Sequence, residues 1–204
     1  MQQLLTDKPP INRFLFWGQW VLLNTIVVAI IITLSLIIDY IPHTIIGWSV
    51  IGISISIIQQ LYLQRHMCLE KWALFSVIGW VIGVLVGKIA VGWEAGSWDV
   101  DWALVGVLVG IAQYFSMRRY VYQAGWWILA SSMSLVMAGS LGGATALLED
   151  WLMFKGWVDI NKSLTEIIGY ILAASAGGAV YGAFTGGWLI WLMWYKSRPM
   201  GVGK

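Results

Sequence analysis

The chain carries six long apolar runs that are nearly free of charge, and this feature constrains its fold more than any other. A transmembrane helix needs about 20 apolar residues to cross a hydrocarbon core of about 30 Å. Hydrophobic residues make up 59% of the 204 residues and charged residues only 11%. We therefore expect an all-α, polytopic membrane protein with one membrane domain over 1–204 and six transmembrane helices, at 14–38, 44–64, 71–92, 99–117, 125–147 and 164–194.

A short pattern recurs inside these runs and indicates three tandem helical hairpins. The pattern Trp-x-Leu-x-[Asn/Ser] begins at Trp20, Trp72 and Trp127. The intervening runs return with Gln and then Arg, at Gln60 and Gln113, whereas the third copy has Thr185 in place of Gln. Every copy has the same topology, so the natural symmetry axis runs along the membrane normal. The pattern predicts a pseudo-three-fold bundle.

Charges outside the runs predict the orientation. With a cytoplasmic N-terminus, nine of the 12 Lys and Arg residues lie on the cytoplasmic side, among them Arg65, Arg118 and Arg119. An excess of Lys and Arg marks the cytoplasmic face, so both termini are expected in the cytoplasm. We interpret these Arg residues as topology determinants with snorkelling stems rather than as a dedicated ligand site.

Small residues four apart indicate tight helix packing. Helices in lipid associate where missing side chains let their backbones approach closely. Such stripes occur in four of the predicted spans, at Gly79, Gly83, Gly87, Gly106, Gly110, Gly139, Gly143, Gly178, Gly182 and Gly186.

Tryptophans near the predicted membrane edges are expected to anchor the helices at the interface. They are Trp17, Trp72, Trp93, Trp98, Trp126, Trp151, Trp157 and Trp194. The segment 147–163 mixes aromatic and charged residues, which is typical of an amphipathic helix lying at the outer interface. An ordinary solvated loop is the alternative.

Polar residues of the repeat fall at one depth, about 8 Å below the inner surface at 1.5 Å of rise per residue. They form a predicted polar belt of Asn24, Gln60, Ser76, Gln113, Ser131 and Thr185. In one interpretation, Gln pairs with Ser or Asn on the neighbouring helix and holds the hairpins in register. In the other, the belt faces a cavity open to the cytoplasm and coordinates a ligand.

Reactive groups are sparse, so no catalytic residue and no metal site is predicted. His43 and His66 are the only histidines, and they are expected at opposite membrane edges. Cys68 is the only cysteine, which excludes an intramolecular disulfide and a multi-cysteine metal site. No cofactor is required by the sequence, although a pigment or lipid is compatible with it, and no nucleic-acid partner is expected.

One stretch resembles a known family. Gly-Ile-Ala-Gln-Tyr-Phe-Ser-Met-Arg-Arg at 110–119, followed by Ala-Gly-Trp-Trp-Ile-Leu-Ala-Ser at 124–131, is similar to small multi-pass membrane proteins of photosynthetic bacteria with GxxxGxxQxxxLRR and GWW repeats. The resemblance extends from Phe14 onward, with departures at Thr185 and in the β-branched first span. It implies a multi-pass protein of a plasma or internal photosynthetic membrane, and no established activity.

Together these features favour a non-enzymatic membrane protein that acts as a scaffold or accessory subunit. Its expected partners are membrane lipid, a pigment, a larger membrane complex or further copies of itself. The alternative is a small-molecule transporter or channel that uses the polar belt as its site.

Overall fold

The computed structural model describes residues 12–37, 45–67, 69, 71–92, 101–121, 123–154 and 162–196. Six helices and no strand occur within these residues, which confirms the prediction of an all-α chain. The helices are α1 (Arg13–Ile37), α2 (Ile45–His66), α3 (Trp72–Val91), α4 (Trp102–Met117), α5 (Trp126–Phe154) and α6 (Lys162–Lys196).

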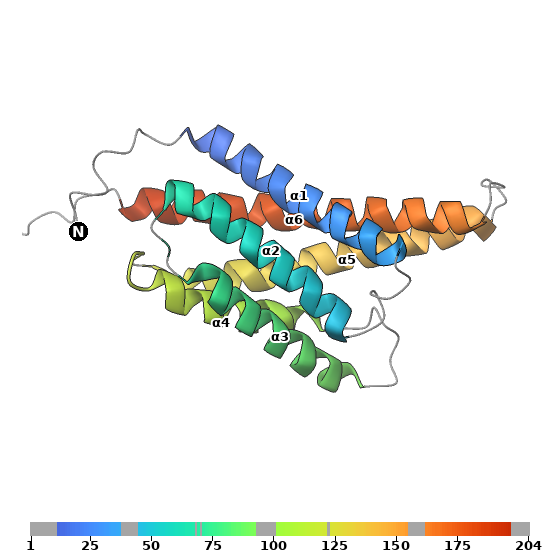
Figure 1. The fold of residues 1–204 in the computed structure, drawn as a ribbon, viewed down its shortest axis with the longest axis horizontal. Helices are drawn as coiled ribbons and strands as arrows, with labels where there is room; N and C mark the ends of the chain where they lie inside the picture. The colour runs from blue at the N-terminus through green and yellow to red at the C-terminus, as the bar shows by residue number, and fades with distance from the viewer. Residues whose placement is uncertain are drawn as a thin grey trace, which may run out of the picture.

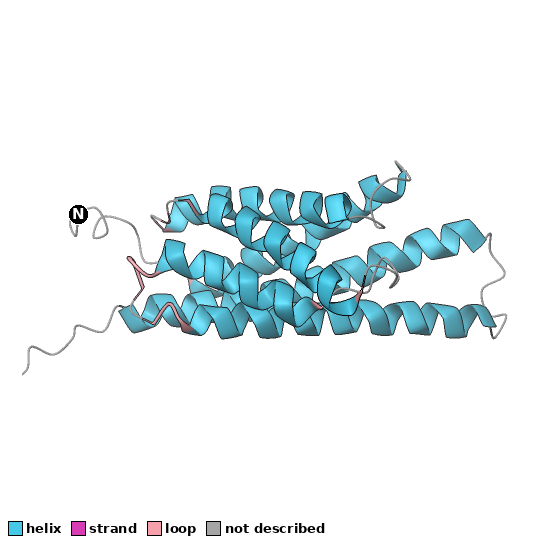
Figure 2. Cartoon of the chain, turned by 90° about the horizontal axis from the view of Figure 1, so that it is seen from below, coloured by secondary structure: helices cyan, strands magenta, loops and turns pink. Residues whose placement is uncertain are grey.

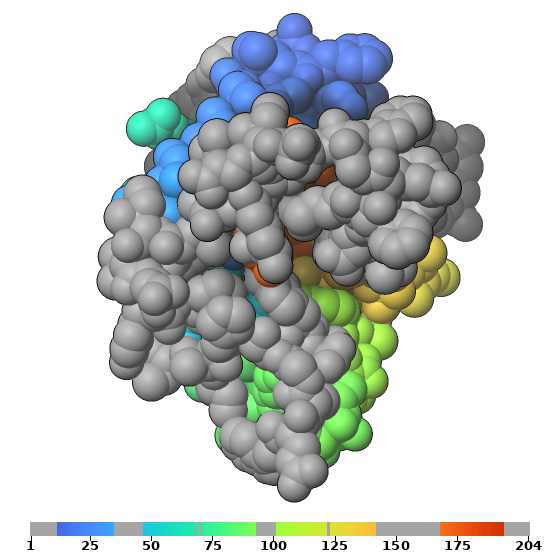
Figure 3. All heavy atoms as spheres, turned by 90° about the vertical axis from the view of Figure 1, so that its right-hand side faces the viewer, coloured from blue at the N-terminus to red at the C-terminus, as the bar shows by residue number. Residues whose placement is uncertain are grey.

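The helices form a closed ring. Consecutive helices run in opposite directions along the long axis of the molecule (Figures 1 and 2). Among the described residues, helix backbones approach one another only between chain neighbours and between α6 and α1. Seen along the long axis, α1, α5 and the α3–α4 pair occupy separate sectors (Figure 3).

Three helices are long and apolar enough to cross a membrane, judged by length and composition: Arg13–Leu34, Trp72–Val91 and Ile168–Met193. α4 and the first part of α5, Trp126–Leu141, are apolar but shorter. α2 is less apolar because polar residues interrupt it, among them Ser54, Ser56, Gln59 and Gln60.

The end of α5 differs from the prediction. α5 continues to Phe154, where an interfacial helix over 147–163 was expected. Residues 144–154 contain no Gly or Pro, so nothing in the chain stops the helix there. α5 and α6 consequently extend beyond the other helices at one end of the bundle (Figure 1). Residues 155–161 lie outside the described part of the chain.

The outer surface of the ring is apolar, and its interior combines apolar side chains with buried polar ones. Large aliphatic residues recur every three or four positions on its outer surface, for example Leu22, Ile26, Ile30 and Leu34, which are 45–57% exposed. The buried polar side chains include Asn24, Gln59, Ser76, Gln113, Ser131 and Thr185, each no more than 2% exposed. An apolar outer surface of this extent is the reverse of that expected for a helix bundle dissolved in water.

Candidate functional site

The buried polar side chains lie between two apolar clusters that fill the ring. The first, here called the Trp cluster, contains Trp20, Trp72 and Trp127 with Phe16, Leu63, Met117 and Leu189. The second, the aliphatic cluster, contains Val27, Ile55, Val84, Val109 and Leu135. Every helix contributes to both clusters or to residues packed on them, so the polar layer has apolar packing on either side.

Gln59 joins three helices. Its Nε2 donates a hydrogen bond of 2.8 Å to Asn24 Oδ1 on α1. Its Oε1 accepts one of 3.3 Å from Trp72 Nε1 on α3. A side chain on α2 thus binds the helix before it and the helix after it. We call such a connection a node.

Gln113 builds a second node with the same geometry. Its Nε2 donates to Ser76 Oγ on α3 at 2.8 Å, and its Oε1 accepts from Trp127 Nε1 on α5 at 2.6 Å. The rings of Trp72 and Trp127 meet edge to face, with centroids 5.6 Å apart, although α3 and α5 are not neighbours in the ring. The two nodes therefore face the same interior.

Thr185 lies at the position of a third node, but its side chain is shorter than that of Gln and binds only one neighbouring helix. Trp20 Nε1 on α1 donates to Thr185 Oγ1 at 2.9 Å, as Trp72 and Trp127 donate to the two glutamines. The Thr185 hydroxyl in turn donates to the Tyr181 carbonyl of its own helix at 2.6 Å. This node links α6 to α1, and no bond runs back to α5.

Ser131 is the belt residue on α5. By position it corresponds to Asn24 and Ser76, each four residues after its Trp. Its hydroxyl is fully buried and has no hydrogen-bond partner. Buried polar groups are rarely left unpaired. Thr185, which occupies the corresponding Gln position on α6, donates to its own helix instead.

Gln60, which the sequence placed in the belt, belongs elsewhere. Its Nε2 donates to the Leu69 carbonyl, and its Oε1 accepts from the Ala73 backbone N–H, both at 2.9 Å. It thus satisfies one of the free N–H groups at the start of α3, where Lys71 offers no side-chain cap. One residue turns a helix by about 100°, so Gln59 faces the interior in its place.

The glycines lie where helix backbones meet. A Cβ at Gly79 or Gly83 of α3 would approach the Val109 or Val105 Cα of α4 to 2.8 or 3.0 Å. A Cβ at Gly110 of α4 would approach the Ile128 Cα of α5 to 2.8 Å. A Cβ at Gly106, Gly178 or Gly182 would also meet the backbone of a neighbouring helix. A Cβ at Gly139 would meet the Trp102 side chain and one at Gly186 the Trp20 side chain, while Gly87 is buried. Gly143 lies in a part of α5 whose side-chain surroundings the structure does not describe.

The predicted interfacial role is wrong for Trp72. Its side chain is fully buried in the Trp cluster, where its indole donates to Gln59. Trp17 and Trp126 are 40% and 50% exposed, as interfacial residues would be. The other five predicted anchors, Trp93, Trp98, Trp151, Trp157 and Trp194, have no described side chain.

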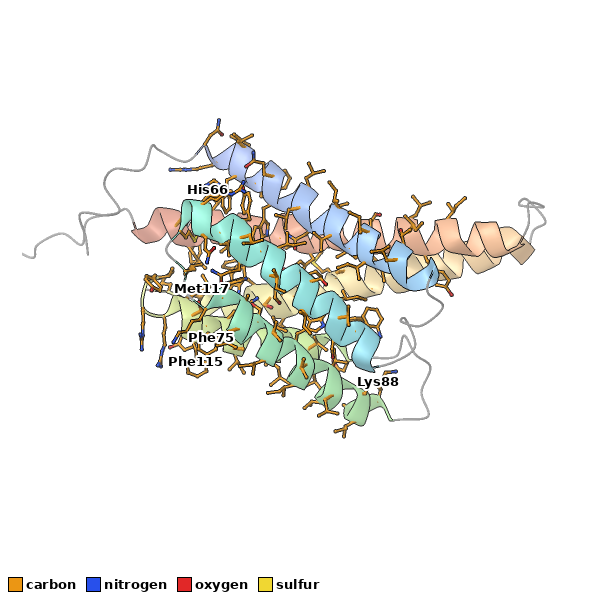
Figure 4. The ribbon with its side chains drawn as sticks, in the orientation of Figure 1. His66, Phe75, Lys88, Phe115 and Met117 are labelled. Atoms are coloured by element: carbon orange, nitrogen blue, oxygen red, sulfur yellow. The ribbon has the colours of Figure 1, made fainter. Side chains whose placement is uncertain are left out.

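The remaining chemistry-bearing residues are separate from the nodes. His66 packs against the rings of Phe16 and Tyr62 at one end of the bundle, and Lys88 is buried near the other end (Figure 4). Among the described residues, no three His, Cys, Asp or Glu side chains lie close enough to hold a metal ion. His43 and Cys68 lie outside them.

Comparisons of the chain with family models, with curated proteins and with solved structures found no match.

Proposed function

We propose that the chain is an integral membrane protein whose six helices all cross the bilayer as three hairpins, with both termini in the cytoplasm. The apolar outer surface of the ring supports membrane insertion, since exposed Leu and Ile suit lipid and the buried amides and hydroxyls avoid it. The matching geometry of the Gln59 and Gln113 nodes supports a repeated hairpin. The Lys and Arg bias supports the orientation.

Cys68 tests this orientation because it is the only cysteine and lies between α2 and α3 in the chain. A membrane-impermeant maleimide should label it in inside-out vesicles and spare it in intact cells. The matched control is Cys68→Ser combined with Ser97→Cys, between α3 and α4, which should give the opposite pattern. Labelling of Cys68 from outside would reject the proposed topology.

Within the membrane, we propose a non-enzymatic role as a scaffold or accessory subunit of a membrane complex. The observation that carries this role is the pairing of the node atoms with one another. Gln59 and Gln113 use both ends of their amides on protein partners, and both side chains are at most 1% exposed. A transport site in the polar layer would instead need polar atoms open to a ligand.

The Trp cluster further favours the scaffold over the transporter. A transport pathway along the axis would pass Trp20, Trp72 and Trp127, all of which are fully buried and packed into one cluster. Moving three indoles would also break the three hydrogen bonds that they donate. A rigid ring with an apolar exterior suits association with lipid, pigment, another membrane protein or a second copy.

Affinity purification from native membranes in mild detergent tests this role. Stoichiometric partner subunits, or a bound chromophore visible in the absorbance spectrum, are the expected result. A colourless protein without partners would count against the scaffold. In that case, a substrate flux into vesicles that Gln113→Leu abolishes would favour the transporter.

A further inference from the structure

An aromatic stack marks the outer surface of the α3–α4 pair at the end where α4 stops. Phe75 and Phe115 stack with ring centroids 6.3 Å apart and planes 29° from parallel (Figure 4). The guanidinium carbon of Arg118 lies 4.9 Å from the centroid of the Phe115 ring. Arg118 is therefore held against the outside of the bundle by its contact with the ring.

The positive charge at this place has no described counter-charge. Arg118 and Arg119 are both exposed. Asp101 is the one carboxylate among the described side chains, and it caps the opposite end of α4 through Ala103 N and Leu104 N. A guanidinium carries a planar fork of N–H donors, and that fork matches the oxygens of a phosphate.

An apolar strip runs from the arginines along the same two helices. Phe115 and Ile111 follow each other four residues apart on α4, at 42% and 37% exposure. On α3, Leu74 and Ile78 are also four residues apart, at 54% and 44% exposure. In a bilayer, these side chains would face lipid tails while the arginines remain at headgroup level.

We propose that Arg118 and Arg119 bind the phosphate of an anionic phospholipid in the cytoplasmic leaflet, with its acyl chain lying along Phe115 and Ile111. This inference rests on the membrane insertion and orientation proposed above. Cationic sites between membrane helices on the cytoplasmic side bind acidic headgroups in this manner. The site is particular to the α3–α4 hairpin, because the positions corresponding to the Arg pair are Gln64 and Arg65 in α2 and Ile190 and Trp191 in α6.

The test uses the full chain in nanodiscs of phosphatidylcholine with a minor fraction of phosphatidylglycerol. Native mass spectrometry then counts the lipids that remain bound after release from the disc. The wild-type chain should retain phosphatidylglycerol in preference to phosphatidylcholine. The Arg118→Gln and Arg119→Gln double variant should lose this preference by about thirtyfold, since two cations near a headgroup contribute about 1 kcal/mol each and every 1.4 kcal/mol is a factor of ten.

Arg65→Gln is the matched control, because it removes one cation from the same face of the membrane without touching the aromatic stack. It should leave the preference intact, and Phe115→Leu should weaken it while keeping the strip apolar. Equal losses for Arg65→Gln and the double variant would overturn the site, as they would show only general attraction to acidic lipid. Correct labelling of Cys68 with no lipid preference would reject the lipid site alone, whereas labelling from outside would reject the topology as well.

Discussion

The contact between α4 and α5 and the contact between α6 and α1 share one geometry but differ in the side chain that accepts a hydrogen bond from the Trp indole. Gly110 faces Ile128 and Ser131 across the first contact, and Gly182 faces Val21 and Asn24 across the second. In each contact, a Trp indole on the second helix donates to a side chain on the first, which is Gln113 in one and Thr185 in the other. The glycines and the indole are common to both contacts.

The difference lies in what the accepting side chain does next. Gln113 has a second end, which binds Ser76 and so fixes a third helix, whereas the Thr185 hydroxyl returns to its own helix. Ser131, which corresponds to Ser76 by position, is buried and unpaired. We infer that close backbone packing brings two helices together and that a glutamine is needed to fix the register of three.

The largest expected loss of stability comes from changing the glycines that both contacts share. Gly110→Val and Gly182→Val should each cost about 3 kcal/mol or more, because the added atoms meet backbone rather than movable side chains. Thermal unfolding in mild detergent measures the loss. Gly187→Val is the control, since a Cβ there meets nothing within 4 Å, and it should change stability little. Similar melting temperatures for all three variants would contradict the packing role of the stripes.

The next effect separates the two accepting side chains. Gln113→Leu should lower stability by about 2 kcal/mol, because it leaves Trp127 Nε1 and the Ser76 hydroxyl without partners. Thr185→Val should lower stability by about 1 kcal/mol, since the Trp20 indole is the one group on another helix that loses its hydrogen-bond partner. Melting curves of both variants test the order, and an unchanged curve for Gln113→Leu would remove the register function.

The smallest expected effects on stability concern two serines at corresponding positions, of which Ser76 is paired and Ser131 is unpaired. Ser76→Ala should cost about 1 kcal/mol because it leaves a buried amide N–H of Gln113 unpaired. Ser131→Ala deletes a hydroxyl that has no partner, so stability should stay within about 0.5 kcal/mol or rise. A substantial loss for Ser131→Ala would show that its hydroxyl has a partner in the protein.

Much of the helical pattern could be predicted from the sequence, because apolar runs of sufficient length have few folded forms. Five of the belt residues could also be found from the repeat, since Asn24, Ser76 and Ser131 keep the same distance from their Trp. Gln59 was missed because Gln60 follows it and either one fits a depth estimate. A spacing of seven residues from Gly to Gln, shared by Gly52–Gln59 and Gly106–Gln113, would have distinguished them.

Other features depend on contacts that no local pattern reveals. Trp72 lies at a predicted membrane edge, and only its hydrogen bond across to α2 shows that it points inward. Ser131 follows the repeat, and only the folded chain shows that its hydroxyl is unpaired and that Thr185 bonds its own helix. α5 continues to Phe154, although the aromatic and charged residues of this segment are also typical of an interfacial helix.

A pair of double-mutant cycles tests most directly whether the polar layer fixes helix register. One cycle combines Gln113→Leu with Ser76→Ala, and the other combines Thr185→Val with Ser131→Ala, with unfolding free energies measured in the same detergent. We predict a coupling energy of about 0.6–2 kcal/mol for the first pair and none for the second. No coupling between Gln113 and Ser76, together with higher stability of their single variants, would contradict the register function and favour a ligand site in the layer.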